Sequence, residues 1–119
     1  MPHSPQDLHK KLLGKKGEKL AEKYLKGLGY ALLFRNYRTP FGEADLVVKK
    51  REEVVFVEVK TRTDDGYGTP AESVTRTKIA HYQKIAAYYL SGQKEEIAVR
   101  FDVVEVYADG QISHIENAF

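Results

Sequence analysis

The chain of 119 residues is 42% hydrophobic and 30% charged with a net charge of +2, which favours one globular domain over residues 1–119 rather than a disordered or membrane-embedded chain. It contains no cysteine, which excludes disulfides, thiolate catalysis and cysteine-ligated zinc, and its four histidines lack metal-ligand spacing. Because no segment resembles a signal peptide or a membrane span, we expect a cytoplasmic protein that does not bind membranes.

A first helix is predicted over Gln6–Leu28, where apolar residues recur at helical spacing and two glycines supply the stop. The first 28 residues carry seven lysines against three acidic residues. This segment, with Lys15 and Lys16, is either an electrostatic footprint for phosphates or a solvated helix face. Glu18 lies at the border of the apolar arc, where it either looks inward to a site or is an exposed helical glutamate.

Three strands are predicted to follow, at residues 30–38, 45–49 and 54–62. The link between the last two has hairpin length, which makes these strands adjacent and antiparallel. Side chains two apart on a strand point to the same face, so Glu58 and Lys60 project together. Asp45 opens the preceding strand and comes within reach of Glu58.

These charged groups stand inside strands composed almost entirely of valine and phenylalanine. An ionised carboxylate in such a strand is costly unless it is paired or bound to a metal. Two converging carboxylates, Asp45 and Glu58, suit a hard divalent cation, Mg²⁺ first, and Lys60 beside them could hold or polarise an attacking water. The alternative is that Glu58 and Lys60 form a structural ion pair or lie on a solvated strand face.

A long polar loop begins at residue 63, directly after the second charged strand. Asp64 and Asp65 are interpreted as turn residues, because aspartate commonly hydrogen-bonds its own backbone in turns. Loops beside a site commonly contact substrate, so Tyr67 is a candidate for base stacking or phosphate contact.

A second helix is predicted from an N-cap at Thr75 to Leu90, with a serine and a glycine ending it. The angular count places Gln83 inside its apolar stripe. Gln83 is therefore either a core glutamine with satisfied hydrogen bonds or a group turned toward the charged cluster. Lys78 and His81 lie nearer the flanks of the stripe and are interpreted as solvated. Two more strands, at 97–107 and 111–115, complete an α/β pattern.

Several motifs in order resemble the bacterial YraN family over most of the chain: Arg35-Asn36-Tyr37-Arg38, Phe41-Gly42-Glu43-Ala44-Asp45-Leu46-Val47, Phe56-Val57-Glu58-Val59-Lys60-Thr61-Arg62, Arg100-Phe101-Asp102-Val103-Val104 and Ile115-Glu116-Asn117-Ala118-Phe119. An aspartate followed in the next strand by Glu-x-Lys also resembles the PD-(D/E)xK nuclease superfamily, near the archaeal Holliday-junction resolvases. Ala44 stands where that motif has proline. The resemblance implies a restriction endonuclease-like α/β fold, with a central mixed β-sheet flanked by α-helices.

The resemblance also implies roles for individual residues. The metal ligands for Mg²⁺ or Mn²⁺ would be Asp45, Glu58, the backbone carbonyl of Val59 and Glu18 from the first helix. Lys60 would act on the attacking water, and Gln83 resembles a site glutamine on the helix that follows the Glu-x-Lys strand. The substrate would be DNA, held by the basic side chains Arg62 and Arg76 and by lysines of the first helix. By analogy with resolvase-like folds, a homodimer is expected.

The sequence is compatible with two positions for Glu43 and with three functions for the chain. Glu43, two residues before Asp45, either shares its face or caps the turn. A nuclease would hydrolyse DNA with a divalent cation, at branched or repair structures, whereas a nucleic-acid-binding module would keep the fold without catalysis. A purely structural partner protein would bind neither DNA nor metal.

Overall fold

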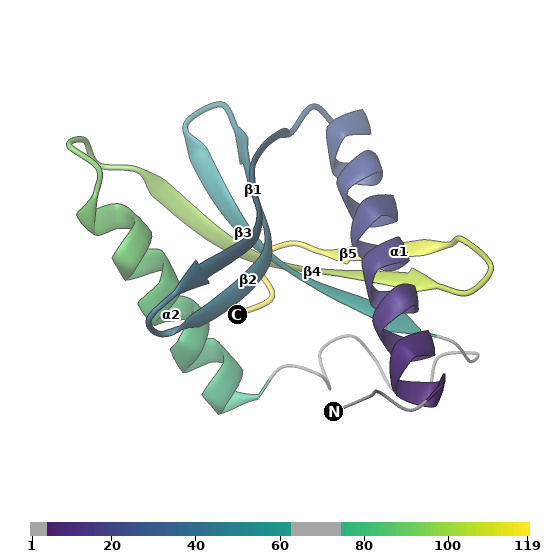
Figure 1. Ribbon diagram of the computed structural model, residues 1–119. Coiled ribbons are helices and arrows are strands. Elements are labelled where there is room, and N and C mark those ends of the chain that lie inside the picture. Colours follow the sequence, from purple (N-terminus) through teal and green to yellow (C-terminus); the bar gives the residue numbers. More distant parts are fainter. Residues whose placement is uncertain (1–4, 63–74) are drawn as a thin grey trace.

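The computed structural model describes residues 5–62 and 75–119, in which a five-stranded sheet lies between two helices (Figure 1). In chain order the elements are α1 (Pro5–Gly27), β1 (Ala31–Thr39), β2 (Gly42–Lys50), β3 (Glu53–Arg62), α2 (Arg76–Ser91), β4 (Ala98–Tyr107) and β5 (Ile112–Ile115). The predicted elements are confirmed in type and order. No helix in these two ranges is long and apolar enough to cross a bilayer.

The sheet has the order β1-β2-β3-β4-β5, and only the pairing of β3 with β4 is parallel. Neighbouring antiparallel strands are joined by short turns, whereas the parallel pair needs the crossover that α2 provides. The predicted α/β class with a mixed central sheet flanked by helices is confirmed. The arrangement is consistent with a restriction endonuclease-like fold.

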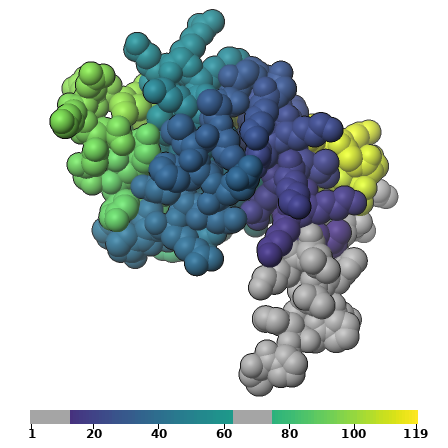
Figure 2. All heavy atoms as spheres, turned by 45° about the horizontal axis from the view of Figure 1, so that its top comes forward, coloured from purple at the N-terminus to yellow at the C-terminus, as the bar shows by residue number. Residues whose placement is uncertain are grey.

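Each face of the sheet has its own apolar core. On one face, Ala21 and Leu25 of α1 pack with Val55 and Val57 of β3. On the other face, residues of α2 pack with the alternate strand positions, among them Phe56. Figure 2 shows α1 (purple) between the β1–β2 region (blue) and the β4–β5 end (yellow). Successive side chains of a strand point to opposite faces of the sheet. The side chains at every second position of β3 after Phe56 therefore face α2.

The β2–β3 hairpin is confirmed, with a turn at Arg51 and Glu52 in which Arg51 adopts a left-handed φ of 57°. The start of β2 differs from the prediction. Because Thr39 pairs with Gly42 across a tight turn, β2 begins three residues before Asp45. Asp45 thus lies within β2 and does not open it.

A buried polar network joins β4 to β5 and to α1. Asp102 is 0% exposed, and its carboxylate accepts hydrogen bonds from Arg100 Nε and Nη2 at 2.8 Å each and from the Asn117 backbone N–H at 3.0 Å. His114 Nε2 lies 2.7 Å from the same carboxylate, and His114 Nδ1 lies 3.1 Å from the Tyr24 hydroxyl. Although burial opposes the charge, the His114, Arg100 and Asn117 contacts hold the pKa of Asp102 below its usual range.

Close packing of α1 on β3 makes one glycine specific. A Cβ atom at Gly17 would collide with the Thr61 hydroxyl and lie 3.3 Å from Thr61 Cβ, whereas a Cβ at Gly14 would meet no described atom within 4 Å. We expect Gly17→Ala to lower the free energy of unfolding by about 1–3 kcal/mol through overpacking. Gly14→Ala, the matched control, should raise it by up to about 1 kcal/mol through helix propensity. Urea unfolding of both variants checks the pair, and equal changes would contradict the close approach.

Candidate active site

The candidate site lies where β2 separates from β3. The regular ladder between these strands ends at the pairing of Leu46 with Val57. Beyond it, the backbone N–H of Val59 donates a 2.7 Å hydrogen bond to the side chain of Asp45. A carboxylate thus takes the place of a strand carbonyl, and it is held beside the neighbouring position on β3, which is Glu58.

Asp45 lies in an environment that disfavours its charge. Burial is the main cause that raises the pKa of Asp45 to about 7, and the charges of Glu58, Glu18 and Glu43 contribute to this rise against the opposing Val59 hydrogen bond. A carboxyl group with such a pKa carries a proton for a substantial part of the time at neutral pH. Perturbed carboxyl groups of this kind are concentrated at functional sites.

Glu58 is held on both of its oxygens by residues of α2. The Tyr82 hydroxyl donates a 2.6 Å hydrogen bond to Oε2, and Lys78 Nζ lies 2.8 Å from Oε1. Tyr82 is 3% exposed and the Glu58 side chain 14%, so water screens these contacts weakly. Burial and the charges of Glu58 and Asp45 raise the pKa of Tyr82, which remains a hydrogen-bond donor.

Lys60 lies next to Lys78 on the face of the sheet that α2 covers. Contact with Lys78, together with burial, lowers the pKa of Lys60. For Lys78 itself burial opposes the charge, but its contacts with Glu58 and Lys60 raise its pKa. The two ammonium groups and the Asp45 and Glu58 carboxylates therefore lie in one cluster, so the structure brings Asp45, Glu58 and Lys60 together.

Arg62 is the residue of β3 that follows Lys60 on the same face of the sheet. Its Nε lies 3.3 Å from Oε2 of Glu105, which is 0% exposed and pairs across the sheet with Lys60. Neither Glu105 oxygen accepts a well-aligned hydrogen bond from the described residues. Glu105 is a buried acidic residue that the sequence pattern did not identify.

Glu18 lies at the border of the cluster. Burial and the charge of Glu43 raise its pKa. With its amide in the orientation that suits its neighbours, Asn36 donates 3.1 Å hydrogen bonds to both Glu18 and Glu43. Glu43 also lies 3.4 Å from Arg38. Glu18 is half-buried, and Asn36 connects it to Glu43 rather than directly to Asp45.

The predicted position of Gln83 is wrong. Helix α2 buries Tyr82, Ile85 and Ala86, and Gln83, which follows Tyr82 by about 100° of helical rotation, is exposed. The interpretation of Lys78 as solvated is also wrong, because Lys78 precedes Tyr82 by four residues and lies on its face. That spacing was the signal available in the sequence.

The remaining predicted contacts are distributed around the cluster. Arg76 is exposed in the first turn of α2, as are Lys15 and Lys16 on α1, and His81 is solvent-exposed as expected. Arg62 is half-buried. Tyr67, with the aspartates predicted to form its turn, lies outside the described residues.

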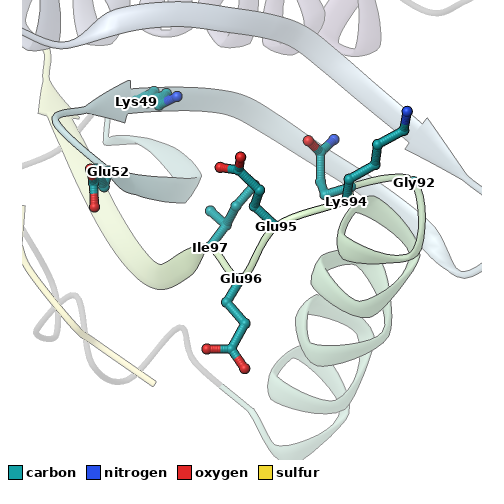
Figure 3. Close-up of a pocket in the computed structure, with 8 residues that line it drawn as sticks. Lys49, Glu52, Gly92, Lys94, Glu95, Glu96 and Ile97 are labelled. Carbon is teal, nitrogen blue, oxygen red and sulfur yellow. The ribbon is translucent and has the colours of Figure 1, made fainter.

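A separate pocket lies at the opposite end of α2 from Lys78. It is lined by Lys49, Glu52, Gly92, Gln93, Lys94, Glu95, Glu96 and Ile97. Charges of both signs line it, and the side chains of Glu95 and Glu96 point apart (Figure 3). The carboxylates that converge are those between β2 and β3.

The donor set of the β2–β3 cluster consists of oxygen atoms. Among the described residues, no three acidic or histidine side chains lie close enough together to hold a metal ion with their present contacts. Asp45 and Glu58 are the adjacent pair, and Lys78 supplies the positive charge beside them. A cation bound to Oε1 of Glu58 would compete with the Lys78 ammonium that already lies 2.8 Å from it.

Comparisons with known proteins agree on one family. The model of the uncharacterised protein family UPF0102 matches residues 17–106. A UPF0102 protein of Thermodesulfovibrio yellowstonii is 50% identical over 107 residues, covering 90% of this chain and 95% of the relative. UPF0102 proteins of Caldicellulosiruptor saccharolyticus and Geobacter metallireducens are 42% and 45% identical, each over 94% of this chain and over 100% and 95% of their own lengths. None of these names states an activity.

Proposed function

Because the chain belongs to the uncharacterised protein family UPF0102, whose name states no activity, we propose its function from the site itself: hydrolysis of DNA phosphodiester bonds with a divalent cation. The observation that carries the proposal is the pair Asp45 and Glu58, held together where β2 leaves β3 with Lys60 on the same face. The order of these residues resembles the PD-(D/E)xK nucleases and the archaeal resolvases, which supports the same reading.

The raised pKa of Asp45 supports a cation at this site. Its carboxyl group has a backbone N–H and nearby carboxylates around it, and a bound positive charge would favour its ionised form. Asp45, Glu58, Glu18 and the Val59 carbonyl would supply oxygen ligands, which is the donor class of Mg²⁺ and Mn²⁺. The Val59 carbonyl suits this role, because in an extended strand it points to the same side as the N–H that binds Asp45.

When bound, the cation would supply Lewis-acid stabilisation of charge on the phosphoryl group. The other steps belong to side chains of the chain. Lys60 would orient an attacking water and offset the developing negative charge. The basic side chains that would hold the phosphate backbone are those of Arg62, Arg76, Lys15 and Lys16, and Tyr67, which lies outside the described residues, would add a further contact. We further propose action in the cytoplasm on branched or repair DNA, as a homodimer, by analogy with resolvase-like folds.

One observation favours a second candidate, a nucleic-acid-binding module without catalysis. Both oxygens of Glu58 already have partners, Tyr82 and Lys78, so the cluster could persist as a structural ion pair. Such a module should bind DNA equally well in chelator and with Mg²⁺. It should also show no cation affinity that depends on Asp45 or Glu58.

A cleavage assay separates the two functions. We expect the wild-type protein with Mg²⁺ or Mn²⁺ to cleave at least one member of a panel of linear duplex, single-stranded and branched DNA, and to cleave none in chelator. Glu58→Gln and Lys60→Ala should reduce the rate at least about 100-fold with an unchanged circular dichroism spectrum. Lys84→Met, which changes an exposed lysine of α2, is the matched control and should retain the rate. Intact DNA across the whole panel with both cations would contradict the proposal.

A further inference from the structure

Lys78 is a charged residue of the cluster to which the proposed chemistry assigns no role. It comes from the first turn of α2, where the Thr75 side chain accepts a hydrogen bond from the Lys78 backbone N–H at 3.1 Å. The cap fixes the start of the helix. The Lys78 side chain is 28% exposed. Lys78 therefore reaches Glu58 from a fixed backbone position.

The contact of Lys78 is made at one particular oxygen. Its ammonium lies 2.8 Å from Glu58 Oε1, while the Tyr82 hydroxyl holds Oε2 at 2.6 Å. If Lys78 leaves, Tyr82 still fixes the orientation of the carboxylate and Oε1 becomes free. The vacated oxygen belongs to the carboxylate that neighbours Asp45.

Two positive charges cannot both occupy this position. The Lys78 ammonium is already repelled by that of Lys60, and a divalent cation at Oε1 would add the repulsion of two further charges. The same carboxylates that attract a cation thus attract Lys78 when no cation is bound. The two ligands of Glu58 compete.

We propose that Lys78 is a built-in counter-ion of this site, which holds Glu58 in the cation-free protein and must leave Oε1 when a divalent cation binds. The inference rests on the proposed cation site and adds a positioning residue to it. Lys78 acts through Glu58, and its release places an ammonium group at the site where a substrate phosphate would need one. Competition of this kind lowers the cation affinity of the free protein.

Cation affinity tests the proposal without any cleavage. We expect Lys78→Met to bind Mn²⁺ about tenfold more tightly than the wild type in isothermal titration calorimetry without DNA. Lys60→Met removes a neighbouring positive charge that makes no ion pair with Glu58 among the described residues, so its gain should be smaller. Lys84→Met, on the exposed side of the same helix, should bind as the wild type does.

A second measurement uses the wild-type chain, so it does not depend on a variant that folds. Reductive methylation followed by mass spectrometry reports the reactivity of each lysine amine. Lys78 should be modified severalfold faster in saturating Mn²⁺ than in chelator, because its release from Glu58 exposes the amine. Lys84 should react at the same rate in both conditions.

The outcomes separate this inference from the proposed function. Measurable and equal Mn²⁺ affinity of wild type and Lys78→Met, or unchanged Lys78 reactivity, would overturn the counter-ion role and leave the cation site standing. No Mn²⁺ binding by either protein would overturn the cation site and the counter-ion role together. Binding by Lys78→Met alone would support the competition in its strongest form.

Discussion

Asp102→Ala is expected to lower the free energy of unfolding by about 3–5 kcal/mol, because it removes the buried carboxylate that Arg100, His114 and the Asn117 backbone N–H share. Arg100 keeps its contacts with Glu53 and the Tyr30 hydroxyl. Arg100 is 17% exposed and makes two hydrogen bonds to Asp102. His114, 6% exposed, and the Asn117 backbone N–H lose their acceptor as well. The lost hydrogen bonds connect β4 to β5 and to the chain that follows β5. Because His114 also contacts Tyr24, the packing of α1 should be weakened as well.

Asp109→Ala is the matched control for this variant. Asp109 is an exposed turn residue whose carboxylate accepts one hydrogen bond from the Gln111 backbone, so its loss should cost about 1 kcal/mol. Urea unfolding at pH 7 measures both. Because the pKa of Asp102 is lowered, its contribution holds at pH values above the ordinary 3.8 and is lost as the pH falls through the lower folded value. Equal losses in the two variants at pH 7 would contradict the network.

The order of helices and strands could be predicted from the sequence because each element depends on local signals. Apolar residues at helical spacing and the glycines that end it mark α1. Thr75 caps α2, and a short polar link joins β2 to β3. The turn before β2 was less predictable. Pairing of Thr39 with Gly42 extends β2, and that depends on turn geometry rather than on hydrophobic alternation.

One rule about strands predicted part of the candidate site. A charged side chain in a valine-rich strand needs a partner, and the rule identified Glu58 on β3. The same rule applies to Asp102 and Glu105 on β4, which are both 0% exposed. Their partners were harder to predict, because His114 and Tyr24 reach Asp102 from distant elements and Arg62 reaches Glu105 across a parallel pair.

Helical angles explain the error over Gln83. An apolar stripe drawn through Tyr82 and Ala86 leaves its centre uncertain by tens of degrees, and the burial of Ile85 moves that centre away from Gln83. The same shift brings Lys78 onto the buried face. A polar residue on a helix can therefore be assigned to a site only when the opposite strand is known.

The Asp45→Asn variant is expected to be inactive and, above pH 7 in chelator, more stable than the wild type by about 2–4 kcal/mol. The asparagine oxygen can still accept the Val59 N–H, whereas the cost of burying a charge beside Glu58 disappears. Because the folded pKa of Asp45 is raised from 3.8 to about 7, its stabilising protonated form is fully present below 3.8 and is lost as the pH rises through about 7. Wild-type stability should therefore fall over this interval, and the variant should not show that loss.

Urea unfolding from pH 4 to pH 9 measures the difference, with the exposed Asp109→Asn as the control that should follow the wild type. Saturating Mn²⁺ at pH 8 should stabilise the wild type, by about 2.7 kcal/mol at a hundredfold excess over Kd, and leave Asp45→Asn unchanged. Parallel pH profiles of wild type and variant in chelator would refute the burial cost. These charges would lower the stability of the cation-free protein, and a bound cation would restore it. Such an arrangement serves binding rather than stability.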